Sequence, residues 1–194
     1  MIDNMNYPKK YLTKLWEVIN EVEITNSKDK SLTLETAIKE ILSKFKTLKK
    51  NDNKVIFIGN GGSAGICSHQ AIDYWKNGKI PATAFNDPSL LTCISNDYGF
   101  EYVFEKPIEM FAKKNDVLIA ISSSGKSKNI INAAKAAKKK GLFVITMSGF
   151  SKTNPLRSCG DLNFYISSDS YGHVEISHLI LSHTFLDNYM KTKI

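Results

Sequence analysis

Short apolar runs that alternate with helix-like stretches are the feature of this sequence that most restricts its fold. The runs are four to six residues long and rich in Val, Ile, Leu and Phe, as buried strands are. They occupy residues 55–58, 82–85, 117–121, 142–147 and 162–166. Because parallel strands are joined by crossover helices, the alternation predicts an α/β protein with a parallel sheet flanked by helices.

Helical segments stand at both ends of the predicted sheet. Apolar residues recur at helical spacing over residues 7–22 and 32–48 before it, and over residues 174–189 after it. The chain has 194 residues, 42% of them hydrophobic, and no low-complexity linker, which is enough for one core. We therefore expect a single domain over residues 1–194, with an N-terminal helical pair (1–50) and a sheet core with a C-terminal helix (51–194).

The cellular compartment is predicted from what the sequence lacks. No apolar run is long enough to span a bilayer, and residues 1–10 contain no apolar core of a signal peptide. The three cysteines, Cys67, Cys93 and Cys159, are odd in number and show no CxxC spacing, which suits a reducing compartment. We expect a cytoplasmic protein with no membrane partner.

The charge balance points to an anionic partner without identifying it. Lys and Arg outnumber Asp and Glu by 26 to 19, a formal net charge of +7. The lysines form short runs near predicted helix ends, at residues 44–50, 113–114 and 138–140, where they complement the helix dipole. Since no aromatic residues are interleaved with them, we expect no nucleic-acid partner, and a phosphorylated small molecule fits better.

A glycine-rich turn follows the first predicted strand. It reads Gly59-Asn60-Gly61-Gly62-Ser63 and leads into a helix that Ser63 is predicted to cap. Glycines let the backbone approach an anion closely, and a helix N-terminus supplies free N–H groups. The turn therefore predicts a phosphate site to which Ser63 belongs.

A serine-rich turn follows the third predicted strand and leads into another helix. It contains four hydroxyl groups and one glycine, in the order Ser122, Ser123, Ser124, Gly125, Lys126, Ser127. Hydroxyl and backbone donors at a helix start can surround a phosphate. Because both turns follow strands of one parallel sheet, we expect them to share a crevice.

Two nucleotide-binding patterns are nearly matched. Gly59, Gly61 and Ala64 satisfy GxGxxG/A, with Asp87 a little over twenty residues later, which leaves a dinucleotide-dependent oxidoreductase as an alternative. The end of a Walker A loop is matched by residues 125–127, but Ala120 stands where its first glycine is required. The serine turn is too short to wrap a triphosphate, and we expect no nucleotide.

Three longer runs carry a resemblance to a known family. The runs are IGNGGSAGICSHQAIDYW at residues 58–75, ISNDYGFEYVF at 94–104 and VLIAISSSGKSKNIINAAKAAKKKG at 117–141. In this order and spacing they resemble the SIS (sugar isomerase) family, and within it the phosphoheptose isomerase branch. The resemblance implies a flavodoxin-like fold with a five-stranded parallel sheet. It also implies a homotetramer in which the two N-terminal helices pack between subunits and active sites form between them.

The same resemblance implies roles for individual residues. It places Asn60, Gly61, Gly62, Asn96 and Asp97 against the sugar phosphate, and it places the phosphate on the hydroxyl groups of Ser122, Ser123, Ser124 and Ser127. It further implies a metal or acid–base group on two helices, formed by His69, Asp73, Glu175 and His183. Glu175 and Asp73 are counted among the substrate contacts as well.

Helix geometry supports this last group independently. His69 and Asp73 are four residues apart and therefore share a helix face, whereas Glu175 and His183 lie roughly two turns apart on another helix. Two imidazoles and two carboxylates suit Zn²⁺, which we expect at one ion per subunit. The chain departs from the family in having Asp73 for Glu and Glu175 for Gln, and His173 and His178 are alternative ligands.

The function that the resemblance implies is an aldose–ketose isomerisation. Sedoheptulose 7-phosphate would be interconverted with D-glycero-D-manno-heptose 7-phosphate through an enediol, for lipopolysaccharide, capsule or another surface glycan. The first candidate for the base is Asp73, the second is Glu175, and His183 would relay protons. The alternative from another class is a non-catalytic SIS-domain binding protein of the type that associates with the replication initiator.

Overall fold

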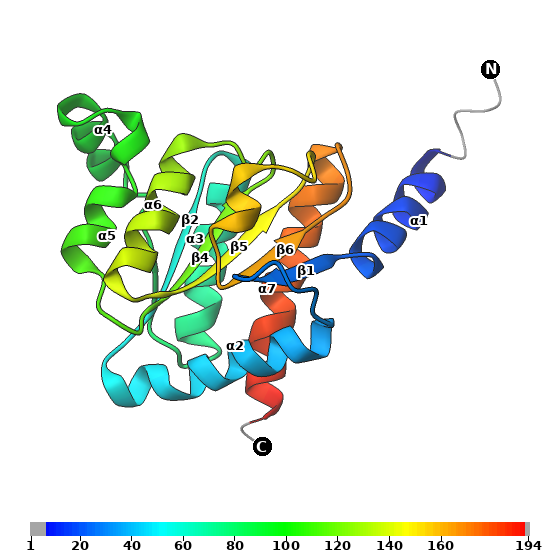
Figure 1. Cartoon of the computed structure of the whole chain (residues 1–194), viewed down its shortest axis with the longest axis horizontal. Coiled ribbons are helices and arrows are strands. Elements are labelled where there is room, and N and C mark those ends of the chain that lie inside the picture. Colours follow the sequence, from blue (N-terminus) through cyan, green and yellow to red (C-terminus); the bar gives the residue numbers. More distant parts are fainter. Residues whose placement is uncertain (1–6, 193–194) are drawn as a thin grey trace.

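The computed structural model describes residues 7–192 and forms a six-stranded sheet with helices on both faces (Figure 1). The strands are β1 (Glu23–Asn26), β2 (Val55–Gly59), β3 (Ala82–Ala84), β4 (Val117–Ser122), β5 (Phe143–Ser148) and β6 (Leu162–Tyr165). The α-helices are α1 (Tyr7–Asn20), α2 (Leu34–Leu48), α3 (Gly62–Lys76), α4 (Pro88–Asp97), α5 (Glu105–Phe111), α6 (Lys128–Lys140) and α7 (Tyr171–Lys191). Short 3₁₀ turns, η2 (Lys49–Asn51), η3 (Phe100–Tyr102) and η4 (Pro155–Ser158), complete the described elements.

The five predicted strands are confirmed, and all of them are parallel. Their order across the sheet is β3-β2-β4-β5-β6. Taken in chain order this is 2-1-3-4-5, the strand order of the flavodoxin-like fold. The order reverses at β2, so the carboxyl ends of β2 and β4 border the crevice where such sheets bind ligands.

The prediction of five strands was one short. A sixth strand, β1, lies inside the predicted N-terminal helical pair and joins the far edge of the sheet, antiparallel to β6. It has only four residues, with Ile24 and Thr25 buried. A run of that length has no recognisable period of its own, and only the exposed edge of β6 orders it as a strand.

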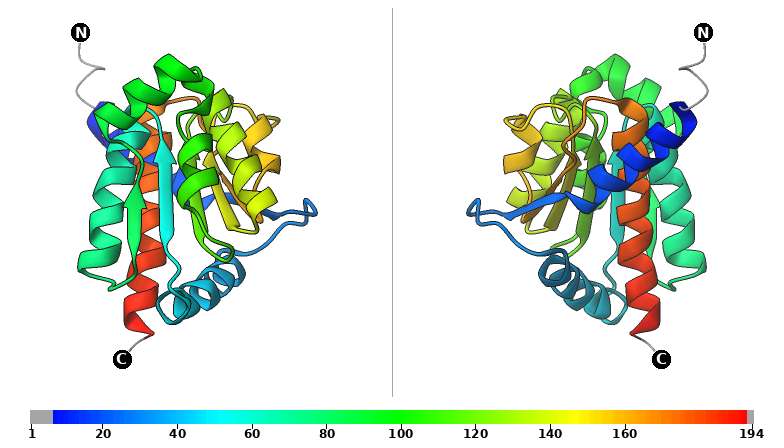
Figure 2. Two further views of the ribbon diagram at one scale, coloured as in Figure 1. Left: turned by 90° about the vertical axis from the view of Figure 1, so that its left-hand side faces the viewer. Right: turned by 90° about the vertical axis from the view of Figure 1, so that its right-hand side faces the viewer.

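Helices cover both faces of the sheet (Figure 2), and an apolar core lies beneath each layer. Alternate strand residues separate between the two cores, so that Phe57 and Ile119 face the core covered by α2, α3 and α7. Ile58 and Leu118 face the core covered by α5 and α6. This burial on both faces explains why the strands read as continuous apolar runs rather than alternating ones.

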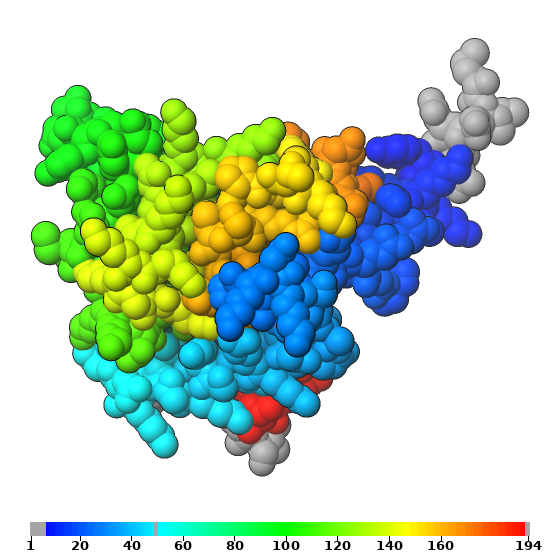
Figure 3. Space-filling view, viewed as in Figure 1, coloured from blue at the N-terminus to red at the C-terminus, as the bar shows by residue number. Residues whose placement is uncertain are grey.

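The two N-terminal helices differ in what they cover. On α2, Ile41 and Phe45 are buried in the chain's own core, so its apolar face is occupied within the subunit. By contrast, α1 projects from the body (Figure 3). Its residues Leu12 and Trp16 are exposed. The domain predicted over 1–194 also includes residues 1–6 and 193–194, which lie outside the described residues. Within residues 7–192, no helix combines the length and apolar composition that crossing a bilayer requires.

Candidate functional site

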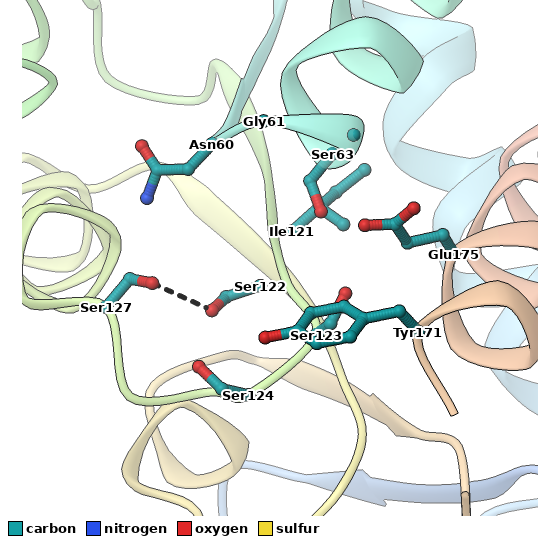
Figure 4. Close-up of a pocket in the computed structure, with 11 residues that line it drawn as sticks. Asn60, Gly61, Ser63, Ile121, Ser122, Ser123, Ser124, Ser127, Tyr171 and Glu175 are labelled. Atoms are coloured by element: carbon teal, nitrogen blue, oxygen red, sulfur yellow. Dashed lines mark hydrogen bonds between the residues drawn. The ribbon is translucent and has the colours of Figure 1, made fainter. Parts of the chain in front are cut away.

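A pocket of about 230 Å³ lies where β2 and β4 end, at the reversal of the strand order (Figure 4). Both predicted phosphate turns line it, so the expectation that they share a crevice is confirmed. Its lining consists of Asn60, Gly61, Gly62, Ser63, Ile121, Ser122, Ser123, Ser124, Ser127, Tyr171 and Glu175. The volume suits a phosphate and a few adjoining atoms, whereas sites for larger ligands usually exceed about 300 Å³.

The glycine turn between β2 and α3 brings a helix N-terminus to the pocket. Gly61 occupies the N-cap position with φ of 54°, a conformation that favours glycine. Ser63, predicted as the cap, instead lies inside the first turn and is buried. Because Gly61 already takes the chain into the helix, the first-turn N–H groups that lack helical partners lie at the pocket.

The serine turn brings a second helix N-terminus to the same pocket. Ser127 is the N-cap residue of α6, as predicted, but its hydroxyl makes no capping bond and lies 3.3 Å from the Ser122 hydroxyl. The Ser124 hydroxyl accepts a hydrogen bond from the Lys126 N–H. Two helix dipoles and several hydroxyl groups thus converge on one small volume, which is the arrangement that binds a phosphate.

A pair of amides ties the two turns together. Asn60 and Asn129 exchange hydrogen bonds through both side chains, at 3.0 and 2.9 Å. Asn129 is buried, and its oxygen also accepts the N–H of Ile130, so its orientation is determined. Asn60 therefore has one amide N–H committed to Asn129 and a second one left for a ligand in the pocket.

The N-terminal turn of α7 closes the remaining side of the pocket. Tyr171 extends its ring into the pocket (Figure 4). The ring packs edge-on against Phe150, with ring centroids 4.8 Å apart. The Glu175 carboxylate lies beside Gly62, where an added Cβ atom would stand 2.5 Å from a carboxylate oxygen. A larger residue than glycine at position 62 would therefore displace Glu175.

A second polar cluster lies further along α3. The carboxylate of Asp73 has one oxygen 3.3 Å from His69 Nε2 and 4.0 Å from His183 Nδ1. Its other oxygen accepts a hydrogen bond from Asn77 at 3.1 Å, which orients the carboxylate. The ligand atoms of the three residues lie within 4.8 Å of one another. The helix period brings His69 to Asp73, and the packing of α7 on α3 adds His183.

The donor set of this cluster fits a zinc ion. Two imidazoles and one carboxylate with an open position are the ligands of many catalytic zinc sites. Zinc bonds are about 2.0–2.2 Å long, so tetrahedral ligand atoms are separated by little more than 3 Å, and only small side-chain shifts would be required here. His69, Asp73 and His183 also retain partial exposure to solvent, which leaves access for a substrate. Within the described residues, Glu175 is not part of the group that the structure brings together.

The two alternative histidines lie elsewhere. His178 is fully buried, and its Nε2 lies 3.3 Å from the carbonyl oxygen of Ser148. Burial lowers the pKa of His178 to about 4, so it is neutral at physiological pH. His173 is also buried and stacks on Tyr11, with ring centroids 4.4 Å apart. Neither belongs to the cluster around Asp73.

Asn96 and Asp97, predicted to contact the sugar phosphate, lie at the carboxyl end of α4. Their side chains are exposed and bond to each other at 3.0 Å. They are not among the residues that line the pocket of this chain. Their proposed contact with a ligand therefore stays a prediction.

Three residues of the site were not foreseen from the sequence. Tyr171 enters the pocket because α7 begins three residues earlier than the predicted helix at 174–189. Asn129 and Gln70 act through contacts with Asn60 and His183, across 69 and 113 residues of chain. No local pattern marks such partners.

Known proteins resemble this chain along most of its length. A family model described as "SIS domain" matches residues 22–149. Phosphoheptose isomerase of Sulfurimonas denitrificans is 34% identical over 185 residues, covering 92% of this chain and 93% of the relative. Phosphoheptose isomerase of Campylobacter concisus is 41% identical over 141 residues, 70% of this chain and 74% of the relative.

Solved structures of phosphoheptose isomerases share the fold of this chain. Phosphoheptose isomerase of Neisseria gonorrhoeae superimposes with a TM-score of 0.77 at 27% identity, over 95% of this chain and 98% of the other. A phosphoheptose isomerase of Francisella tularensis shares the fold with a TM-score of 0.82 at 24% identity, over 98% and 100% of the two chains.

Proposed function

Since the chain belongs to the SIS domain family, we propose that it is a phosphoheptose isomerase that interconverts sedoheptulose 7-phosphate and D-glycero-D-manno-heptose 7-phosphate. The observation that carries this proposal is that α3 connects the phosphate pocket to the cluster around Asp73. The helix begins at the phosphate pocket with Gly62 and presents His69 and Asp73 further along. The rise from Gly62 to His69 is about 10 Å, which an extended seven-carbon sugar phosphate can span.

The pocket holds the phosphate end of the substrate. The starts of α3 and α6, the serine hydroxyl groups and the free amide N–H of Asn60 supply donors to a dianion. With the phosphate anchored there, the carbon chain runs along α3, so that C1 and C2 reach the cluster around Asp73. Fixing one end in this way lowers the entropy cost of positioning the reacting carbons.

The isomerisation moves a proton between C1 and C2. Asp73 is the base that removes it, because one carboxylate oxygen faces the partly exposed space beside the two imidazoles while Asn77 holds the other oxygen. His183 acts on the two substrate oxygens through Nδ1: it carries the accompanying proton between them while Nδ1 is free, and it helps to hold the metal that polarises them when Nδ1 is a ligand. Glu175, beside the phosphate turn, is the second candidate for the base.

We propose that His69, Asp73 and His183 hold a zinc ion, with Glu175 as a further ligand if its side chain turns away from Gly62. When bound, zinc polarises the substrate oxygens and so favours loss of the adjacent proton. The donor chemistry and the separations within the cluster support this assignment.

A homotetramer in the cytoplasm completes the proposal. Leu12 and Trp16 on α1 border an apolar groove that continues to Ile180 on α7, and exposed apolar surface of this kind is typical of subunit contacts. Native mass spectrometry at micromolar concentration tests the oligomeric state. The three unpaired cysteines favour a reducing compartment.

The deciding experiment follows turnover of sedoheptulose 7-phosphate by NMR, with zinc-loaded and chelator-treated protein. Turnover should occur with zinc and fall at least about a hundredfold in Asp73→Asn and His183→Gln, because each removes a group that acts on the reacting atoms. Asp187→Asn, an exposed acid one turn beyond His183 on α7, is the matched control and should retain activity. Phosphosugar binding without turnover in either state would refute the isomerase and support the non-catalytic alternative.

A further inference from the structure

Gln70 makes a contact that neither the family resemblance nor the proposed reaction explains. It follows His69 on α3 but points into the protein, where it is fully buried. Its Nε2 lies 3.0 Å from His183 Nε2, whereas its Oε1 has no hydrogen-bond partner. A buried amide with an unpaired oxygen costs free energy, so packing alone is a poor reason for a glutamine here.

The contact links the orientation of the Gln70 amide to which nitrogen of His183 carries a proton. A neutral imidazole has one N–H, and its two nitrogens therefore take opposite roles. When the Gln70 amide N–H donates to Nε2, that nitrogen is bare and Nδ1 carries the proton. Nδ1 is the nitrogen that lies 4.0 Å from Asp73. In this arrangement His183 offers Asp73 a proton and has no lone pair for a cation.

The reverse arrangement is reached by turning the amide over. Gln70 Oε1 then accepts an N–H from His183 Nε2, and Nδ1 becomes bare and free to ligate a cation beside Asp73. Each orientation makes one hydrogen bond to the imidazole, so the two are matched in number. Because Gln70 occupies Nε2 in both, Nδ1 is the nitrogen left for a cation.

We propose that Gln70 is a positioning residue of the zinc site, which sets the tautomer of His183. It donates to Nε2 when no metal is bound, and its amide turns over to accept from Nε2 when Nδ1 ligates the metal. This inference rests on the proposed zinc site at His69, Asp73 and His183. Outer-shell partners of metal-binding histidines act in this way, and their loss typically lowers metal affinity about 10- to 100-fold.

The first test uses the unaltered protein. ¹⁵N-labelled imidazoles are observed by NMR at pH 8 with chelator and with zinc, and the His183 signals are assigned by their loss in His183→Gln. A protonated and a bare ring nitrogen have well-separated ¹⁵N shifts. The expected result is Nδ1–H with chelator and Nε2–H with zinc. The same tautomer in both samples overturns the proposal.

The second test uses two variants of similar volume. Gln70→Met cannot hydrogen-bond, so we expect a mixture of tautomers with chelator and zinc affinity reduced about 10- to 100-fold in competition with a chromophoric chelator. Gln70→Glu only accepts, so at a pH where the imidazole is neutral it should show Nε2–H without metal. Should Gln70→Met fail to fold, Gln70→Glu alone decides.

The outcomes separate this inference from the proposed function. A wild-type tautomer in both variants, or zinc affinity of Gln70→Met within twofold of the wild type, overturns the role of Gln70. Failure of the wild type to bind zinc instead overturns the metal site, while the tautomers in chelator still test the contact. Neither readout depends on isomerase activity.

Discussion

Replacing Gly125 by alanine should be a highly damaging single-methyl change in the serine turn that borders the phosphate pocket. Gly125 lies in the serine turn with φ of 62°, and an added Cβ atom would stand 1.9 Å from Asn154 Oδ1. Asn154 is buried; its two amide N–H groups are shared among the Ser148 hydroxyl and the carbonyls of Gly149 and Ser151, and its oxygen accepts the Arg157 N–H, which together amount to about three hydrogen bonds. A rigid, fully bonded neighbour cannot move aside as a flexible surface chain would.

The magnitude follows from these contacts. The left-handed backbone costs alanine about 1 kcal/mol, and displacing Asn154 forfeits hydrogen bonds worth about 1 kcal/mol each. Together we expect a loss of about 4 kcal/mol in the free energy of unfolding. With an m-value of about 2 kcal/mol/M in urea, the midpoint should fall by about 2 M.

Two other glycines provide matched controls in the same assay. Gly61 also has positive φ, with ψ of −122° outside the left-handed helical region, but no atom lies within 4 Å of the added Cβ, so Gly61→Ala should lower the free energy of unfolding by about 1–3 kcal/mol through backbone strain alone. Gly65 lies within α3, has no positive φ and has no atom within 4 Å of an added Cβ. Gly65→Ala should therefore raise the free energy of unfolding by about 0.5–1 kcal/mol.

Urea denaturation followed by circular dichroism measures all three variants, and a double-mutant cycle isolates the clash. In an Asn154→Ala background, Gly125→Ala should cost only about 1 kcal/mol, because the obstructing amide is gone. If Gly125→Ala lowers the free energy of unfolding equally in the wild-type and Asn154→Ala backgrounds, then Asn154 yields freely and the reasoning is refuted.

Further predictions concern binding, metal and pH. Asn129→Leu removes both hydrogen bonds to Asn60, so KM for the phosphosugar should rise roughly tenfold with little change in kcat, as steady-state kinetics would reveal; an unchanged KM contradicts it. Asp73→Asn removes a proposed zinc ligand. Calorimetric titration should therefore show that its zinc affinity falls by more than the roughly 10- to 100-fold typical of losing an outer-shell partner. The buried His178, with its pKa at about 4, is protonated first in the unfolded chain as pH falls from 6.5, so the folded state should lose about 2 kcal/mol between pH 7.5 and 5. In urea titrations at the two pH values, the free energy of unfolding of His178→Gln should fall by about 2 kcal/mol less than that of the wild type. An equal fall in both proteins would contradict this role of His178.

Local features of the sequence were enough to predict the framework of this protein. Five parallel strands follow from apolar runs between helices, because burial on both faces of a sheet leaves a mark within a few residues. The glycine and serine turns are equally local, since both the backbone freedom of glycine and a helix start are read from neighbouring residues. The facing of His69 and Asp73 depends only on the helix period.

Contacts between distant segments were decided by the tertiary structure. β1 is a strand because β6 offers it an edge, although more than a hundred residues separate them. The packing of α7 on α3 decided that His183 joins His69 and Asp73 and that Glu175 lies against Gly62, and the packing of α7 on the sheet buried His178 beside Ser148. These outcomes depend on how helices pack against one another, and a helix period specifies which residues share a face but not which neighbour that face will meet.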